Sequence, residues 1–97
     1  MTKPIAPKYS QPESRRFHAR CCRAVDLNEA EMRLLELACC AWDRSSEARQ
    51  VIERDGLLLD GRLHPAVAVE RAARGDFARL INQLKLTIRL PDLGLVF

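Results

Sequence analysis

The segment from Gly56 to Pro65 constrains the fold of this chain most, because it combines a helix stop, a tight turn and a helix start. Gly56 follows a long helical pattern and suits a left-handed cap after a helix. The Asp60-Gly61 pair lies between short apolar runs and predicts a two-residue hairpin turn. Pro65 suits the first position of a new helix, where its missing N–H is no loss. The chain is therefore expected to reverse direction between two helices.

A long helix is predicted before this turn, from a start at Asn28 to about Asp55. Asn28 is followed three residues later by Glu31, which is the pattern of a capping box. Apolar and small residues recur on one face in alternating steps of four and three, and residues 32–42 are apolar on almost every side, so this helix needs several neighbours. The recurring residues are Leu34, Ala38, Ala41, Ser45, Ala48 and Ile52.

The helix after the turn is predicted over residues 65–85 and should fold back antiparallel on the long helix. Gly75 inside it costs about 1 kcal/mol relative to alanine, and either permits close approach of a neighbouring helix or marks a bend. Glu70 and Arg74 form an i,i+4 pair, and with His64 we interpret them as framework residues. The apolar face comprises Ala66, Val69, Ala73, Phe77, Leu80 and Leu84, with Val67 and Ile81 beside it.

A shorter amphipathic helix is predicted over residues 12–24, with Ser10 as its cap and Pro12 in its first turn. Its apolar face carries Phe17, Cys21 and Ala24, and an arginine stripe follows another face. Residues 1–25 hold six basic residues against one acidic residue, a net charge of +5, within a total of +3. This asymmetry suggests a polyanion-binding segment, the alternative being a solvated basic leader. The candidate DNA contacts are Arg15, Arg16, Arg20 and Arg23.

The cysteines form two adjacent pairs, Cys21-Cys22 and Cys39-Cys40. Adjacent residues on a helix point about 100° apart, whereas zinc ligands are spaced to face one metal, so we interpret the cysteines as small buried residues. His18 leaves open a nucleophilic cysteine, although nothing in the sequence marks an orienting carboxylate. No phosphate loop or metalloprotease motif occurs. We therefore expect no catalytic residue, metal or cofactor.

Residues 87–97 form an apolar tail in which residues 87–90 alternate like a strand. A monomer seldom exposes so much contiguous apolar surface, so we expect the tail to contact a partner, with packing on its own helices as the alternative. The candidate docking residues are Leu93, Leu95 and Phe97.

The composition favours an all-α fold, because aromatic residues make up only 5% of the 97 residues and the core must be built from Leu, Val, Ile and Ala. We expect a short N-terminal helix and a long antiparallel helical hairpin with a small β-turn connection. The expected organisation is a flexible basic arm (1–11), a helical domain (12–86) and the apolar tail (87–97). Apolar runs are too short to span a bilayer, which predicts a soluble intracellular protein.

The order and spacing of these motifs resemble the phage terminase small-subunit family over roughly residues 15–90. The matching elements are Arg16-Phe17, Leu34-Leu35 with Ala38, Trp42-Asp43-Arg44, Asp55-Gly56, His64-Pro65-Ala66, Glu70-Arg71 with Arg74, and Phe77 with Leu80.

The resemblance implies a non-enzymatic protein that forms a closed ring in the host cytoplasm, binds viral double-stranded DNA and regulates the large terminase subunit, which holds the ATPase and nuclease. A helix that is apolar nearly all round agrees with assembly into a ring. The chain departs from many relatives in lacking a clear helix-turn-helix. The candidate oligomerisation residues are Leu34, Leu35, Leu37, Ala38, Ala41 and Trp42.

Two alternative classes remain open from the sequence. A small helical transcriptional regulator would bind a palindromic site as a dimer, whereas a packaging ring would have many subunits and weak sequence preference. An enzyme using Cys21 or Cys22 would show a reactive thiol at neutral pH.

Overall fold

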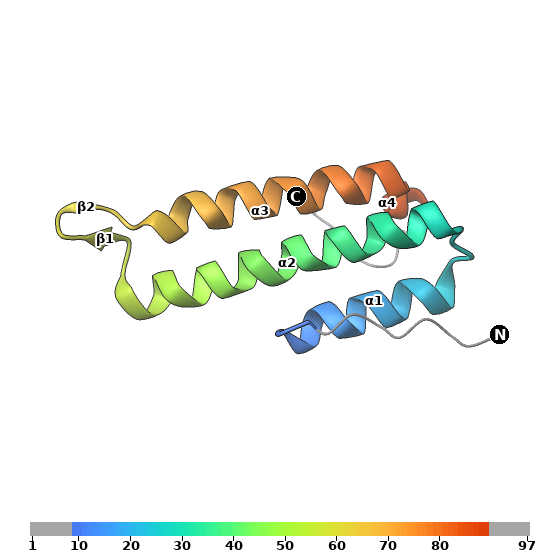
Figure 1. Ribbon diagram of the computed structural model, residues 1–97, viewed down its shortest axis with the longest axis horizontal. Helices are drawn as coiled ribbons and strands as arrows, with labels where there is room; N and C mark the ends of the chain where they lie inside the picture. The colour runs from blue at the N-terminus through green and yellow to red at the C-terminus, as the bar shows by residue number, and fades with distance from the viewer. Residues whose placement is uncertain (1–8, 90–97) are drawn as a thin grey trace.

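The computed structural model describes residues 9–89, and this part of the chain is predominantly helical, as predicted. The long helices α2 (Glu29–Asp55) and α3 (Pro65–Leu84) lie side by side and antiparallel, while α1 (Pro12–Ala24) runs along α2 (Figure 1). The strands β1 (Leu58–Leu59) and β2 (Arg62–Leu63) join α2 to α3 at the far end. The predicted helical hairpin with a small β connection is therefore confirmed.

The start of α2 is the predicted capping box. The Asn28 side chain accepts a hydrogen bond from the Glu31 backbone N–H at 2.8 Å, and the Asn28 N–H donates to Glu31 Oε1 at 3.1 Å. At the other end, the Gly56 N–H donates to the Ile52 carbonyl at 2.7 Å. Gly56 has a φ of 86°, which is positive as a left-handed cap requires. Its ψ of 170° is extended, however, so the residue is not in the left-handed helical conformation and that prediction is wrong.

The two-residue turn is also as predicted. Asp60 and Gly61 have φ angles of 52° and 76°, and two successive positive φ values match the right-handed twist of a tight hairpin. Leu58 pairs with Leu63 and Leu59 with Arg62. Because directly opposed residues share one face of a hairpin, Leu59 and Arg62 project together.

Helix α3 begins at Pro65 and ends at Leu84, where Lys85 adopts a left-handed conformation with φ of 56°. At Gly75, an added Cβ would meet nothing within 4 Å, and the residue is exposed. Of the two alternatives given for Gly75, close approach of another helix therefore does not occur within the described part of the chain. The short helix α4 (Leu86–Arg89) follows directly.

The core lies where α1, α2 and α3 meet. The predicted apolar faces of α2 and α3 are confirmed except at Val69, which is 48% exposed. Ala66 and Ala73 occupy the narrow contact with α2, and Val69 lies at the edge of that stripe. The buried apolar residues of the core cluster are Tyr9, Cys21, Leu35, Ala38, Cys39, Ala41, Phe77, Leu80, Ile81, Leu84 and Leu86.

Two further expectations are corrected. Ala24 is exposed, because α1 ends there and Val25 packs against the core instead. The predicted strand-like segment is helical as far as Arg89, since Leu86 is fully buried and anchors the last turn. The candidate docking residues of the tail lie outside the described residues. No helix within residues 9–89 is long and apolar enough to cross a membrane.

Candidate nucleic-acid-binding helix

One carboxylate of α2 holds the start of α1. Asp43 Oδ1 accepts hydrogen bonds from the Gln11 backbone N–H at 2.8 Å and from Ser14 Oγ at 3.1 Å. Asp43 Oδ2 accepts from the Ser10 backbone N–H at 3.0 Å and from Ser10 Oγ at 2.6 Å. These bonds hold the N–H groups of the two residues that precede the helix, and the negative charge complements the helix dipole.

The prediction that Ser10 caps α1 is wrong. Gln11 is the N-cap residue and contributes no side-chain cap. Asp43, on another helix, instead accepts hydrogen bonds from the N–H groups of Ser10 and Gln11, the two residues before the first helical residue. Burial disfavours its charged form, but the bonds from Ser10, Gln11 and Ser14 outweigh burial and hold the pKa of Asp43 below its ordinary value. Asp43 is therefore a stable carboxylate at neutral pH.

The anchored side of α1 is buried and the opposite side is basic. Ser14, His18 and Cys21 are spaced by four and three residues, and all are buried against α2 and its neighbours. Each arginine of the stripe lies two residues after one of these buried residues. Two residues correspond to a rotation of about 200° around a helix. The stripe therefore faces away from the core. The exposed members of this stripe are Arg16, Arg20 and Arg23.

Arg15 is exposed beside this stripe, and its guanidinium donates to the Tyr9 carbonyl at 2.7 Å. Among the described residues, Arg16 and Arg23 form no ion pair. On α3, by contrast, Arg74 lies 3.8 Å from Glu70 and Arg79 lies 3.4 Å from Asp76. Helix α1 has four arginines against one acidic residue, Glu13, whereas α3 has three against two, so α1 carries the larger net positive charge. That is the property required for contacting a polyanion.

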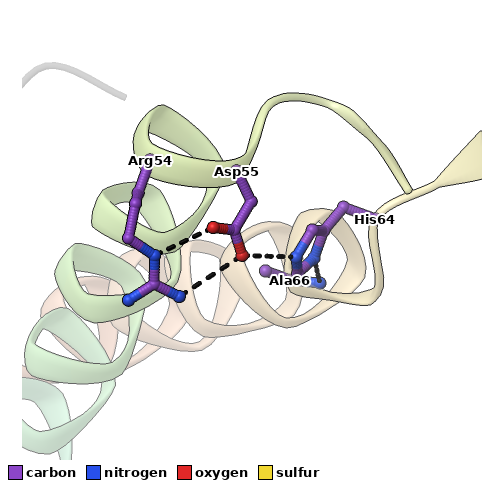
Figure 2. Close-up of polar contacts among 4 residues, drawn as sticks. All are labelled: Arg54, Asp55, His64 and Ala66. Atoms are coloured by element: carbon purple, nitrogen blue, oxygen red, sulfur yellow. Dashed lines mark hydrogen bonds and ion pairs between the residues drawn. The ribbon is translucent and has the colours of Figure 1, made fainter. Parts of the chain in front are cut away.

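The junction of α2 and α3 is built from framework residues (Figure 2). His64 Nδ1 accepts from the Ala66 N–H at 3.0 Å, so the ring proton lies on Nε2, which is 3.2 Å from Asp55 Oδ2. Arg54 contacts the same carboxylate at 2.8 Å. His64 therefore caps α3 and ties its start to the end of α2.

Glu70 has a similar bracing position between α2 and α3. It lies 3.8 Å from Arg74, which is the predicted i,i+4 contact, and 3.5 Å from Arg49 on α2. Ser45 Oγ donates to the same Glu70 oxygen at 3.3 Å. These contacts confirm the interpretation of Glu70 and Arg74 as framework residues.

A comparison with protein families identifies the family of this chain. The family model described as phage terminase, small subunit, matches residues 13–90. The chain belongs to this family. The comparisons with curated proteins and with solved structures found no match. Family membership places this small terminase subunit in phage DNA packaging, as the motifs predicted.

The candidate oligomerisation residues of this small terminase subunit have different environments. Leu35, Ala38 and Ala41 are buried within the subunit's own core. Leu34 and Trp42 are partly buried against that core. Leu37 is 57% exposed, on a stripe of α2 shared with the exposed residues Arg33, Cys40 and Arg44. Only Leu37 of the set therefore exposes most of its side chain in the single subunit.

The cysteines are all free thiols, and one of each adjacent pair is buried, Cys21 and Cys39. Cys22 and Cys40 are exposed, so the prediction of small buried residues is right for half of them. Cys22 Sγ lies 3.9 Å from His18 Nδ1. Burial, and then the nearby charge of Glu36, raises the pKa of Cys22, which is opposite to the shift a nucleophile needs.

Within the described part of the chain, no three His, Cys, Asp or Glu side chains come together where they could hold a metal ion. Asp43 appeared in the sequence analysis only as part of the family resemblance, and its hydrogen bonds to the start of α1 were not predicted. Its partners lie 29 to 33 positions away, and a single acidic residue in a long helix has no local signal for such a role.

Proposed function

We propose that this small terminase subunit assembles into a closed ring in the host cytoplasm, binds viral double-stranded DNA through α1 and regulates a large terminase subunit. The observation that carries the DNA-binding part is the arrangement of α1. Its buried side is fixed on α2 by Asp43, while its arginine stripe faces solvent. The proposed DNA contacts are Arg15, Arg16, Arg20 and Arg23.

Assembly into a ring would strengthen DNA binding, because it brings together the positive charge of several subunits. Each copy contributes one basic helix, so a ring places many such helices around one axis and multiplies the attraction for phosphate groups. Contacts of this kind give affinity with weak sequence preference. The exposed side chain of Leu37 supports a contact between neighbouring copies on α2.

The DNA-binding proposal is tested by replacing Arg16, Arg20 and Arg23 with alanine. Affinity for duplex DNA should fall by a similar factor for several sequences. A plot of log affinity against log salt concentration should become less steep, by roughly 0.9 for each phosphate group that the variant no longer neutralises. Fluorescence anisotropy across salt concentrations measures both, and light scattering should show unchanged assembly. The matched control removes the same charge from α3 through Arg71, Arg74 and Arg79 to alanine.

Unchanged affinity and salt slope in the α1 variant, with weaker binding by the α3 control, would move the DNA site to α3. Native mass spectrometry of the unaltered chain tests the ring. A stable dimer that prefers one palindromic sequence would instead indicate the transcriptional regulator.

Regulation of the large subunit is assigned to the tail, through Leu93, Leu95 and Phe97. A short apolar peptide can fill pockets on a partner with a few anchor side chains. Deleting residues 91–97 should leave the ring and its melting temperature unchanged while abolishing stimulation of the large subunit's ATPase. Lower stability or loss of the ring would instead show that the tail packs on its own helices.

A further inference from the structure

The β1–β2 hairpin exposes a cluster of leucines at the end of the molecule. Leu57, Leu58, Leu59 and Leu63 are 59%, 64%, 48% and 61% exposed. An isolated two-stranded hairpin is marginally stable in water, and an apolar cluster of this kind usually marks an interaction site. The hairpin tip is therefore suited to contact another surface.

A second feature, an apolar cavity of about 160 Å³, lies between α1, α2 and α3. Aromatic rings form much of its wall: the ring centroids of Trp42 and Phe77 are 5.0 Å apart, and those of Phe17 and Phe77 are 5.8 Å apart. A cavity of about 150 Å³ with apolar walls accommodates a group of the size of benzene. A leucine side chain is therefore a suitable occupant. The lining residues are Glu13, Ser14, Phe17, Cys39, Trp42 and Phe77.

The hairpin tip and the cavity are complementary in charge. Leu59 and Arg62 are directly paired across the hairpin, so an apolar and a cationic side chain project from the same face. The cavity has the exposed carboxylate residue Glu13 on its lining. Within the described residues, neither Arg62 nor Glu13 forms an ion pair. A leucine entering the cavity can thus be accompanied by an arginine that meets the carboxylate.

We propose that Leu59 of one copy inserts into the cavity of a neighbouring copy, and that Arg62 pairs there with the neighbour's Glu13. The tip and the cavity are different surfaces of the chain, so the contact is head to tail, the type that closes into a ring when the rotation between copies allows it. This inference rests on the proposed ring and identifies which side chains join its subunits.

A charge-reversal cycle tests the contact on the full-length chain. Glu13→Arg and Arg62→Glu should each raise the concentration needed for assembly at least tenfold, because each places like charges opposite one another. The double variant Glu13→Arg with Arg62→Glu should restore assembly. Light scattering over a dilution series measures the oligomer, and circular dichroism checks that every variant remains helical.

Two leucine variants supply a matched pair that does not depend on charge. Leu59→Ser should disrupt assembly, whereas Leu58→Ser changes the adjacent and more exposed leucine on the other face of the hairpin and should leave assembly unchanged. Failure of the double charge variant to restore assembly, or equal effects of the two serine variants, would overturn the contact.

The unaltered chain separates this inference from the proposed function. If it forms a ring that none of the variants at Glu13, Leu59 or Arg62 disturbs, the ring stands and the proposed contact is wrong. If it is monomeric at micromolar concentration, both the ring and the contact are wrong, and DNA binding by α1 is then judged from its salt dependence alone.

Discussion

Ser14 on α1 donates a hydrogen bond from its buried hydroxyl to the Asp43 carboxylate on α2, over 3.1 Å. Because Ser14 faces inward, this bond fixes the rotation of α1 about its own axis. Gln11 and Ser10 bring their backbone N–H groups to the same carboxylate and fix the position of the helix start. Together with burial of His18 and Cys21, these bonds to Asp43 hold the arginine stripe outward.

Replacing Asp43 with alanine should lower the free energy of unfolding by about 1–3 kcal/mol, because the start of α1 loses its charged hydrogen-bond acceptor. Amide hydrogen exchange should accelerate chiefly in α1. Urea denaturation and exchange measured by mass spectrometry check both effects. Glu53→Ala, which removes an exposed carboxylate from the same helix, is the control and should change stability by less than about 0.5 kcal/mol. Equal effects of the two variants would contradict the role of Asp43.

The same carboxylate should make the protein sensitive to acid. Its pKa in the folded state lies below the ordinary value of 3.8, so its stabilising contribution is present above that value and is lost as the pH falls through the folded pKa. Asp43→Asn should therefore be less stable than the unaltered protein at neutral pH, and the difference should shrink below about pH 4. Thermal denaturation between pH 2 and pH 7 measures the difference; a gap independent of pH would show that the charge of Asp43 is unimportant.

Leu35 and Leu37 should respond differently to the same substitution. Leu35 is fully buried, so Leu35→Asp places a charge in the core and should unfold the subunit. Leu37 is 57% exposed, so Leu37→Asp should leave the helices intact and weaken the proposed assembly. Circular dichroism reports folding, and analytical ultracentrifugation reports the oligomer. Full assembly of the Leu37 variant would remove α2 from the proposed subunit contact.

Gly75 and Gly61 form a pair with opposite expected effects on substitution by alanine. Gly75 is exposed within α3 and has open space around it, so Gly75→Ala should raise the free energy of unfolding by about 0.5–1 kcal/mol. Gly61 has a φ of 76°, which strains any residue with a Cβ, so Gly61→Ala should lower stability. Urea denaturation measures both. Destabilisation by Gly75→Ala would indicate that this surface of α3 is covered in the assembly.

The thiols should react in two classes. Burial raises the pKa of Cys21 to about 11 and that of Cys39 to about 12, so both remain protonated and inaccessible near neutral pH. Cys22 and Cys40 are exposed and should react with a disulfide reagent in the folded protein. Reaction of all four should require denaturant. Rapid reaction of a single cysteine at neutral pH would instead favour a nucleophilic site.

The sequence alone predicted the helix boundaries and the turn with few errors. The capping box at Asn28, the Asp60-Gly61 turn and the start at Pro65 are local signals, because each depends on φ angles and hydrogen bonds within four residues. The arginine stripe was readable for the same reason, since residues spaced by three and four share a helix face.

Tertiary structure alone decided which side of each helix is covered. Residues 32–42 are apolar on almost every side, so periodicity could not distinguish the buried Leu35 from the exposed Leu37; the positions of α1 and α3 around α2 make that difference. The hydrogen bonds from the start of α1 to Asp43 likewise join residues about 30 positions apart. Local propensity acts over a few residues, whereas burial and hydrogen bonding between helices depend on which distant surfaces meet, and for this protein those surfaces determine where the arginines point.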